Sequence, residues 1–296
     1  MRKVRVYKRE VEIIEGRIIK GIGGFYYVSD KAGAVYECKA RGKFRREKVT
    51  PMVGDIVEFE KLDGYDSIEQ ILPRRNFLLR PAVANIDSMI LVLSAGKPEA
   101  DLFLCDKLLI QAEQNGIAPV IVINKAETAP ARVEELKAQY MGYDVIITSA
   151  KDGVGIDELK EKIRGMCVCF AGQSAVGKSS LINTLEHEFD LEIGELSKKT
   201  DRGKHTTREV ELLYVPSCSA YVVDTPGFSM YDSHIDKAEV SDYYPELRAL
   251  KGECRFSSCV HDKEPDCAVK AAVEAGKISK ERYDRYLRII HLTEEK

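Results

Sequence analysis

The sequence predicts a multidomain protein in which an all-β barrel precedes an α/β domain and a mainly helical C-terminal domain. Short strand patterns fill the region before residue 76, strand and helix patterns alternate up to about residue 232, and helix patterns with clustered cysteines follow. We therefore expect domains at residues 1–75, 76–232 and 233–296. A chain of 296 residues is long enough to form several hydrophobic cores.

The first region is expected to form a small barrel of the OB type. Turn signals at residues 21–24 and 63–64 separate its strand patterns, and no convincing helix interrupts them. The expected strands are residues 16–20, 25–28, 34–40, 55–61 and 67–72.

A basic run in this region indicates contact with a polyanion. Residues 39–48 hold six Lys and Arg around Phe44, and residues 1–75 carry 17 Lys and Arg against 12 Asp and Glu. OB barrels bind single-stranded nucleic acid by combining a cationic groove with stacking rings, which Phe25, Tyr26 and Tyr27 can supply. We expect an RNA-binding OB domain; an unevenly charged, solvated surface is the alternative.

The second region alternates buried strands with amphipathic helices, which predicts a parallel sheet covered on both faces. Ligands of such sheets bind at the carboxyl ends of the strands. The expected strands are residues 86–93, 119–123, 145–148, 167–171 and 221–223, and the expected helices are 102–115, 132–140, 156–163 and a segment from 179 onward.

A phosphate-loop motif, G-x-x-x-x-G-K-[ST], follows one of these strands. Its glycines let backbone N–H groups surround phosphates at a helix N-terminus, Lys178 would neutralise the β- and γ-phosphates, and Ser179 would bind Mg²⁺. The predicted phosphate-binding residues are Gly172, Gln173, Ser174, Ala175, Val176, Gly177, Lys178, Ser179 and Ser180.

Two further motifs at strand ends predict guanine recognition. Asn124, Lys125, Ala126 and Glu127 form a base-reading motif in which the carboxylate accepts from guanine N1–H and the exocyclic amine. Glu127 stands where aspartate is usual, which affects the strength of guanine preference. Ser149, Ala150 and Lys151 are expected to back the base.

The catalytic and magnesium-binding residues are expected around Asp224. Asp224 and a threonine of the first switch (Thr206 or Thr207) would complete the Mg²⁺ shell, and the Gly227 N–H would contact the γ-phosphate. Phe228 occupies the position where many GTPases carry the glutamine that orients water. His205 is therefore the candidate catalytic residue, with a surface role as the alternative.

The order of these motifs is unusual, because the base motifs precede the phosphate loop while Asp224 follows it. Ordinary small GTPases place the phosphate loop first. The sequence therefore predicts a circularly permuted GTPase domain.

The C-terminal region contains a candidate zinc site. Cys254, Cys259, His261 and Cys267 form C-x4-C-x-H-x5-C, and three thiolates with one imidazole make a closed tetrahedral shell of the structural kind. Chance clustering is the alternative. A helix capped by Ser279 is expected to follow, with Tyr283, Tyr286, Leu287 and Ile290 on one face.

The remaining composition indicates a cytoplasmic protein. No apolar run is long enough to span a bilayer or to act as a signal peptide, and eight cysteines in such a chain favour thiols and metal ligands over disulfides. We expect no membrane partner, and a monomer.

Together these features resemble one family, the small ribosomal subunit biogenesis GTPases RsgA (YjeQ, YloQ). The resemblance covers essentially the whole chain and is carried by the barrel, the permuted motifs, residues 79–85, 202–207 and 224–228, and the cysteine–histidine cluster. Departures from the family pattern are Glu127 and Ala175, the latter where glycine is usual.

This resemblance implies a GTP hydrolase that uses GTP or GDP with Mg²⁺ and carries one structural Zn²⁺. It also implies binding to the small (30S) ribosomal subunit and its rRNA during late maturation. Slow intrinsic turnover, stimulation by the subunit and release of assembly factors such as RbfA belong to the same expectation.

Two other classes remain to be distinguished. A constitutive RNA-binding protein with a structural nucleotide is favoured slightly by Phe228, and Ser179 and Asp224 argue against it. An ATP-dependent kinase is disfavoured by Asn124 and Lys125.

Overall fold

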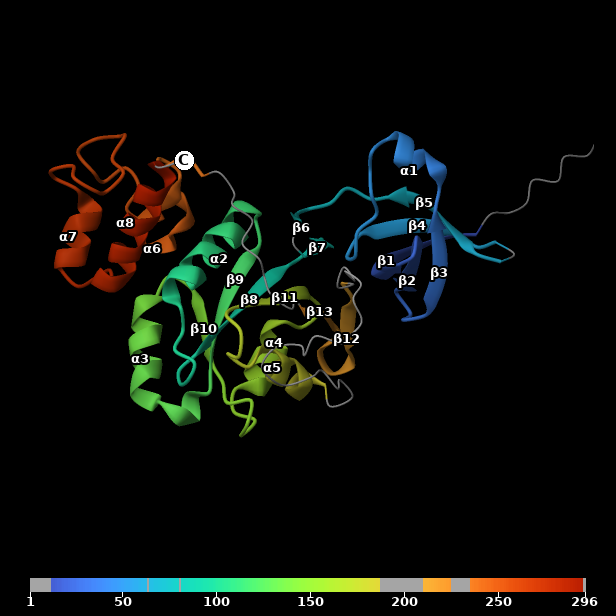
Figure 1. The fold of residues 1–296 in the computed structure, drawn as a ribbon, viewed down its shortest axis with the longest axis horizontal. Coiled ribbons are helices and arrows are strands. Elements are labelled where there is room, and N and C mark those ends of the chain that lie inside the picture. Colours follow the sequence, from blue (N-terminus) through green and yellow to red (C-terminus); the bar gives the residue numbers. More distant parts are fainter. Residues whose placement is uncertain (1–11, 63, 80, 187–209, 225–234, 295–296) are drawn as a thin grey trace, which may run out of the picture. The chain divides into compact units, whose positions relative to one another are not determined.

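The computed structural model describes residues 12–62, 64–79, 81–186, 210–224 and 235–294. The chain folds into two compact units, of which the first contains the barrel and the second contains both the parallel sheet and the helical C-terminal region (Figure 1). The predicted fold class is confirmed. The domain boundaries at 75/76 and 232/233 stay a prediction.

The barrel closes with strand order β1-β2-β3-β5-β4, where β4 pairs with β1 in antiparallel register and β3 pairs with β5 in parallel register. Its core includes Ile18, Val28, Val57, Phe59 and Ile68. The strands are β1 (Ile13–Ile22), β2 (Phe25–Asp30), β3 (Val35–Ala40), β4 (Ile56–Glu60) and β5 (Asp66–Ile71). All five expected strands are present.

One barrel element was not expected. A short helix, α1 (Gly42–Arg46), occupies the basic run, and its only buried residue is Phe44. The side chain of Phe44 belongs to the barrel core, so this ring is not available to stack on a base.

The second unit is built on a six-stranded sheet of order β10-β9-β8-β11-β13-β12, in which the pairs from β10 to β13 are parallel. The strands are β8 (Ser88–Ser94), β9 (Ala118–Asn124), β10 (Asp144–Ile147), β11 (Cys167–Ala171), β12 (Leu212–Val215) and β13 (Ala220–Asp224). A separate two-stranded sheet pairs β6 (Phe77–Leu79) with β7 (Ala82–Ala84). The edge strand β12 and this small sheet were not expected.

Helices pack on this sheet from two sides. One core cluster joins alternate residues of the strands, such as Ile90 and Val92, to α4 (Ile156–Lys162) and α5 (Lys178–Leu185). Because side chains alternate along a strand, Met89, Leu91 and Leu93 face the opposite side, where α2 (Leu102–Gln114) contacts β8 and β9. The helix α3 (Pro130–Gln139) and the 3-10 turns η1 (Ala126–Thr128) and η2 (Pro216–Cys218) complete this part.

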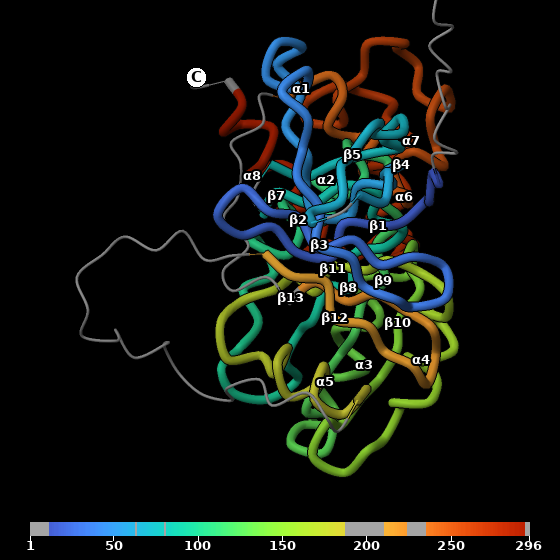
Figure 2. The backbone as a smooth tube through the Cα atoms, turned by 90° about the vertical axis from the view of Figure 1, so that its right-hand side faces the viewer, coloured from blue at the N-terminus to red at the C-terminus, as the bar shows by residue number. Residues whose placement is uncertain are grey.

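The C-terminal region has a core of its own. Its elements are η3 (Val240–Tyr243), α6 (Pro245–Arg248), α7 (Ala268–Glu274) and α8 (Lys280–Glu294), drawn in orange and red in Figures 1 and 2. The Ser279 hydroxyl accepts from the N–H of Arg282, so it caps α8 as predicted. Tyr286 and Ile290 of the predicted apolar face are fully buried in this core, together with Ile110 of α2.

Candidate functional site

The phosphate loop connects β11 to α5. Two of its glycines adopt backbone conformations that would be strained in other residues. Gly172 has φ +135°, and a Cβ there would lie 2.4 Å from the carbonyl oxygen of Val92. Gly177 has φ +99°, and its Cβ would lie 2.3 Å from Nδ2 of Asn124. Both positions therefore require glycine for space as well as for backbone torsion.

Ala175 is a strained position in the same loop. Its φ is +62°, in the left-handed region that disfavours a residue with a Cβ. This gives a physical reason why glycine suits this position better than alanine.

The Lys178 side chain turns back over the loop. Its Nζ donates to the carbonyl oxygens of Gly172 and Gln173, both at 2.8 Å. A positive charge is thus held against the curved backbone at the start of α5, where the helix dipole also favours anions.

The base motif is bound directly to the phosphate loop. Asn124, which ends β9 and is 1% exposed, donates from Nδ2 to the Val176 carbonyl at 3.0 Å. Lys125, with φ +59°, donates from Nζ to the carbonyl oxygens of Ala175 and Lys97 at 2.8 Å. Asn124 and Lys125 therefore fix the position of the base motif relative to the phosphate loop.

The third nucleotide motif meets the same asparagine. Oδ1 of Asn124 accepts from the Ala150 N–H at 3.1 Å and from the Thr148 hydroxyl at 3.2 Å. Ser149 and Asp152 form a hydrogen-bonded turn that contains the exposed Lys151, and Glu127 is exposed in η1. The two base motifs thus meet at the buried amide of Asn124.

Of the residues predicted to bind magnesium or to act in catalysis, only some belong to the described part of the chain. Ser179 lies in the first turn of α5, and Asp224 ends β13, where its backbone pairs with Phe170 of β11. The hydroxyl and the carboxylate offer the oxygen donors that Mg²⁺ prefers. His205, Thr206, Thr207, Gly227 and Phe228 lie outside the described residues.

The basic run of the barrel is only partly available to a polyanion. Arg41 already pairs with Glu60 at 3.2 Å and Glu69 at 2.5 Å, whereas Arg45 and Arg46 are exposed on α1. A neighbouring cluster combines a charge with one exposed and one half-buried ring. Nζ of Lys39 lies 4.6 Å from the ring centre of Phe25 and 4.1 Å from that of Tyr65, whose side chain is 51% exposed.

The cysteine–histidine cluster has the geometry of a metal site. The four ligand atoms of Cys254, Cys259, His261 and Cys267 lie within 4.8 Å of one another. Nδ1 of His261 is 3.6, 3.5 and 3.4 Å from the sulfurs of Cys254, Cys259 and Cys267. A tetrahedral Zn²⁺ with one nitrogen and three sulfur ligands requires separations of about 3.5–3.8 Å, so the residues fit the ion.

Burial shifts the pKa values of His261 and Cys259 in opposite directions. Burial lowers the pKa of His261, which favours the neutral imidazole that binds metals. Burial and the neighbouring sulfurs raise the pKa of Cys259, so a thiolate here needs a cation beside it.

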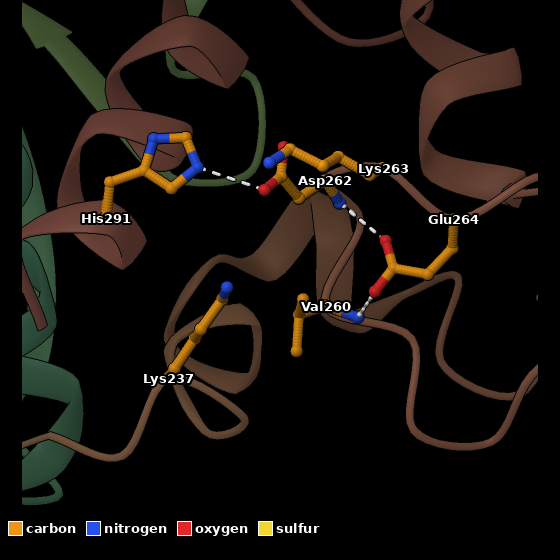
Figure 3. Close-up of a pocket in the computed structure, with 6 residues that line it drawn as sticks. All are labelled: Lys237, Val260, Asp262, Lys263, Glu264 and His291. Carbon is orange, nitrogen blue, oxygen red and sulfur yellow. Dashed lines mark hydrogen bonds and ion pairs between the residues drawn. The ribbon is translucent and has the colours of Figure 1, made fainter. Parts of the chain in front are cut away.

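The backbone around His261 is held by side chains of the same domain. Glu264 accepts from the N–H groups of Val260 and Asp262 at 2.9 and 2.8 Å, beside a surface pocket (Figure 3). The Tyr283 hydroxyl donates to the His261 carbonyl, and the Tyr286 hydroxyl donates to that of Val260. These contacts orient the histidine, which has φ +59°.

Three contacts near the nucleotide site were not inferred from the sequence. The Gln173 side chain accepts from the backbone of Asp101, Thr148 supports Asn124, and Lys97 binds Lys125. The weak signal for the first was Asp101, a standard N-cap residue that directly precedes a helix pattern.

The motifs at the ends of β9, β11 and β13, with the base motif earliest in the chain, define a circularly permuted GTPase domain in a protein that also contains an OB-type barrel. The described helices include none that is both long enough and apolar enough to span a membrane.

Comparisons with known proteins identify the family. Residues 71–234 match the family model described as RsgA GTPase, and residues 15–68 match the RsgA N-terminal domain. The chain is 46% identical over 292 residues to the small ribosomal subunit biogenesis GTPase RsgA of Caldanaerobacter subterraneus, covering 97% of this chain and 98% of the relative. It is also 46% identical over 278 residues to the RsgA of Moorella thermoacetica, covering 93% and 95%.

Solved structures agree with the sequence comparisons. The crystal structure of YjeQ from Thermotoga maritima is similar with a TM-score of 0.84 and 37% identity, covering 96% of this chain and 100% of that one. YloQ, described as a circularly permuted GTPase, gives 0.81 and 33%, covering 99% and 98%. The chain belongs to the RsgA family of GTPases, which are hydrolases of GTP.

Proposed function

We propose that this protein binds GTP and GDP with Mg²⁺ and hydrolyses GTP during late maturation of the small (30S) ribosomal subunit. The names of its relatives support the ribosomal role. The observation that carries the nucleotide role is the hydrogen bond from Asn124 to Val176, because it holds a base-reading motif and a phosphate loop as one site.

The nucleotide roles follow the chemistry of each segment. Lys178 neutralises the β- and γ-phosphates, Ser179 and Asp224 bind Mg²⁺ with Thr206 or Thr207, and the Gly227 N–H contacts the γ-phosphate. Residues 124–127 and 149–151 bind guanine, with the longer Glu127 in place of aspartate.

Turnover is slow on the free protein and faster on the subunit. Phe228 cannot hydrogen-bond a water, so we assign its orientation to His205, which the subunit brings into place. His205→Ala is expected to keep GTP and subunit binding and to lose most of the stimulated rate. Full stimulation of this variant would move the role to another group, such as one from the ribosome.

The barrel binds rRNA through charge and stacking. The exposed ring of Tyr65 and the half-buried ring of Phe25 lie beside Lys39. They support this role because OB barrels bind single strands at this combination of strands and loops. Reversing Lys43, Arg45 and Arg46 to Glu should weaken subunit binding most strongly at low salt. Tyr65→Ala should weaken it with little change in salt dependence. Neither change should alter affinity for free GTP.

The remaining parts of the proposal concern the location, oligomeric state, domains, zinc content and assembly-factor release of this protein. The protein acts as a cytoplasmic monomer with domains at residues 1–75, 76–232 and 233–296, carries one structural Zn²⁺, and promotes release of assembly factors such as RbfA. Co-sedimentation of RbfA with subunits, with and without this protein and GTP, tests the release step.

One assay separates this function from a constitutive RNA-binding role. GTP turnover is measured with purified small subunits, with large subunits as the control, and without ribosomal particles. We expect a strong stimulation by small subunits alone. Equal turnover in all three conditions, with tight subunit binding, would instead support an RNA-binding protein with a structural nucleotide.

A further inference from the structure

Three arginines of α8 run along α2, the helix that begins beside the phosphate loop. Arg282, Arg285 and Arg288 are spaced three residues apart, so they share one side of their helix. Arg282 and Arg285 bind Asp106, and the Arg288 guanidinium lies 4.0 Å from the ring centre of Phe103 in the first turn of α2. The C-terminal domain therefore contacts α2 over more than one turn.

The centre of this contact is a buried ion cluster. Asp106, whose side chain is 0% exposed, accepts on Oδ1 from Nη1 of Arg282 at 2.5 Å and from the Tyr140 hydroxyl at 3.0 Å. Its Oδ2 accepts from Nε of Arg285 at 2.6 Å. Nε of Arg282 also donates to Glu246 at 2.6 Å, so two carboxylates balance two guanidinium groups.

Aromatic rings enclose the central arginine. The Arg282 guanidinium lies 4.4 Å from the ring centre of Tyr244, 4.8 Å from that of Tyr140 and 5.5 Å from that of Tyr143. Burial opposes its charge, but Asp106 and Glu246 outweigh burial and raise the pKa of Arg282 well above its ordinary value. The guanidinium therefore stays charged inside the protein.

Joining two helices through this cluster costs free energy, because polar and charged groups are buried. Nη2 of Arg282, Nη2 of Arg285, Oε2 of Glu246 and the Tyr244 hydroxyl are buried without a hydrogen-bond partner among the described residues. Buried ion pairs of this kind are often no more stabilising than apolar side chains of similar volume, whereas their directional bonds allow few alternative arrangements. The main effect of the cluster is thus to fix the position of α2 along α8, and its contribution to stability is secondary.

The N-terminus of α2 is hydrogen-bonded to the phosphate loop, so the position of α2 influences the position of the loop. Asp101 caps the helix by accepting from the N–H groups of Phe103 and Leu104, and its own N–H donates to Oε1 of Gln173 at 2.9 Å. Asp101 and Asp106 are five residues apart, which corresponds to about 7.5 Å along a helix. Gln173 is the second residue of the phosphate loop.

We propose that Arg282 and Arg285 are positioning residues for the nucleotide site, acting through Asp106, α2 and Asp101 on Gln173. This inference rests on the nucleotide site proposed above. A partner that displaces α8 then changes nucleotide affinity, and nucleotide binding changes the affinity for that partner by the same factor.

The test is a double-mutant cycle read out by GDP affinity. Arg282→Met keeps much of the side-chain volume and removes the charge, and Gln173→Ala cuts the contact between α2 and the loop. Each single change is expected to weaken GDP binding by at least about fivefold. The double variant is expected to bind no more weakly than Gln173→Ala alone, because both changes interrupt the same connection.

The controls separate positioning from folding. Arg248→Ala removes the ion pair from Arg248 to Glu113, which joins the same domain to the C-terminal end of α2, and should leave GDP affinity unchanged. Arg285→Gln spares the pair between Arg282 and Asp106, and should lower GDP affinity by a smaller factor. This variant replaces Arg282→Met in the test if Arg282→Met does not fold. Zinc content and the thermal transition report folding of each variant.

Two results would overturn the inference. Folded Arg282→Met or Arg285→Gln protein with wild-type GDP affinity would show that the cluster is only structural. Independent losses that multiply in the double variant would show that α2 is not the connection. Failure of the wild-type protein to bind GDP would instead refute the proposed function.

Discussion

The zinc cluster and the phosphate loop hold their functional groups in opposite ways. In the cysteine–histidine cluster, Nδ1 of His261 lies 3.4–3.6 Å from three sulfur atoms, an arrangement that fits a tetrahedral Zn²⁺. At the nucleotide site, Lys178 of the phosphate loop and Asn124 and Lys125 of the base motif already have hydrogen-bond partners in the protein. We therefore predict that the cluster depends on a metal ion for its stability, whereas the nucleotide site keeps its shape without a ligand.

This difference concerns the sequence range over which each site is built. The zinc ligands span residues 254–267, in a region that reaches its core through α7 and α8. Asn124 and Val176 are 52 residues apart. Asn124 ends β9, whereas Val176 lies in the phosphate loop after β11, and β8 separates these two strands in the sheet. Loss of ligand should therefore unfold the first site and leave the second intact.

The largest effect is expected from removing the ion. Cys254→Ser should lose zinc and most of the C-terminal structure, because metal binding in such sites provides about 10–16 kcal/mol of apparent folding free energy. Metal analysis and proteolysis measure this result. Ser258→Ala, in the same loop, should retain about one zinc per chain. A folded, metal-free Cys254→Ser protein would remove the contrast between the two sites.

A smaller effect on folding, but a severe one on binding, is expected from Lys178→Ala. The variant should bind GTP and GDP far more weakly, because the phosphates lose a charge-assisted contact worth about 1.5–3 kcal/mol or more. Its thermal transition without nucleotide should stay near that of the wild type. Lys137→Ala, which changes an exposed lysine of α3, is the matched control for charge. Unchanged affinity for nucleotide in Lys178→Ala would contradict the site.

Gly177→Ala tests whether the loop shape comes from contact or from torsion alone. Its Cβ would meet Nδ2 of Asn124 at 2.3 Å, so the base motif should shift and GDP affinity should fall. Gly165→Ala also has positive φ, +71°, but nothing lies within 4 Å of its Cβ. It should lose about 1 kcal/mol of stability and keep its GDP affinity. Equal GDP affinity in both variants would show that the close approach of Asn124 is unimportant.

The smallest expected effect is a gain. Ala175→Gly relieves the left-handed strain at φ +62°, and the greater freedom of glycine in the unfolded chain offsets part of it. A net increase of about 0.5 kcal/mol in the free energy of unfolding is expected from urea titration. Ala271→Gly, at an exposed position in the middle of α7, should instead destabilise the protein. A destabilised Ala175→Gly would mean that the loop relaxes in another way.

Sequence patterns predicted the regular elements because those depend on local periodicity. The strands of the barrel and the helix from Ser279 follow from alternation, turn residues and a cap. The spacing of Cys254, Cys259, His261 and Cys267 predicted a cluster that the structure brings together.

Features that depend on distant partners were not predictable in this way. Phe44 was expected beside a basic surface and lies in the barrel core, because the short helix α1 turns it inward. Asp106 interrupts an apolar helix face because it binds Arg282. This partner is 176 residues away in the sequence, so the local pattern does not reveal it. The positions of His205 and Gly227 stay predictions.

The hydrogen bond from Asn124 to Val176 has a consequence for biosynthesis. In this permuted order the ribosome makes the base-reading strand β9 first, and the carbonyl partner of Asn124 emerges 52 residues later. Domains generally fold as they emerge, N-terminal parts first. Thr148 and Ala150, which bind Oδ1 of Asn124, are made before β11, but Nδ2 of Asn124 lacks its Val176 partner until β11 and the phosphate loop have been added. Nucleotide can assist only the closing steps of folding, and the nascent barrel and β8–β10 must reach their positions without it.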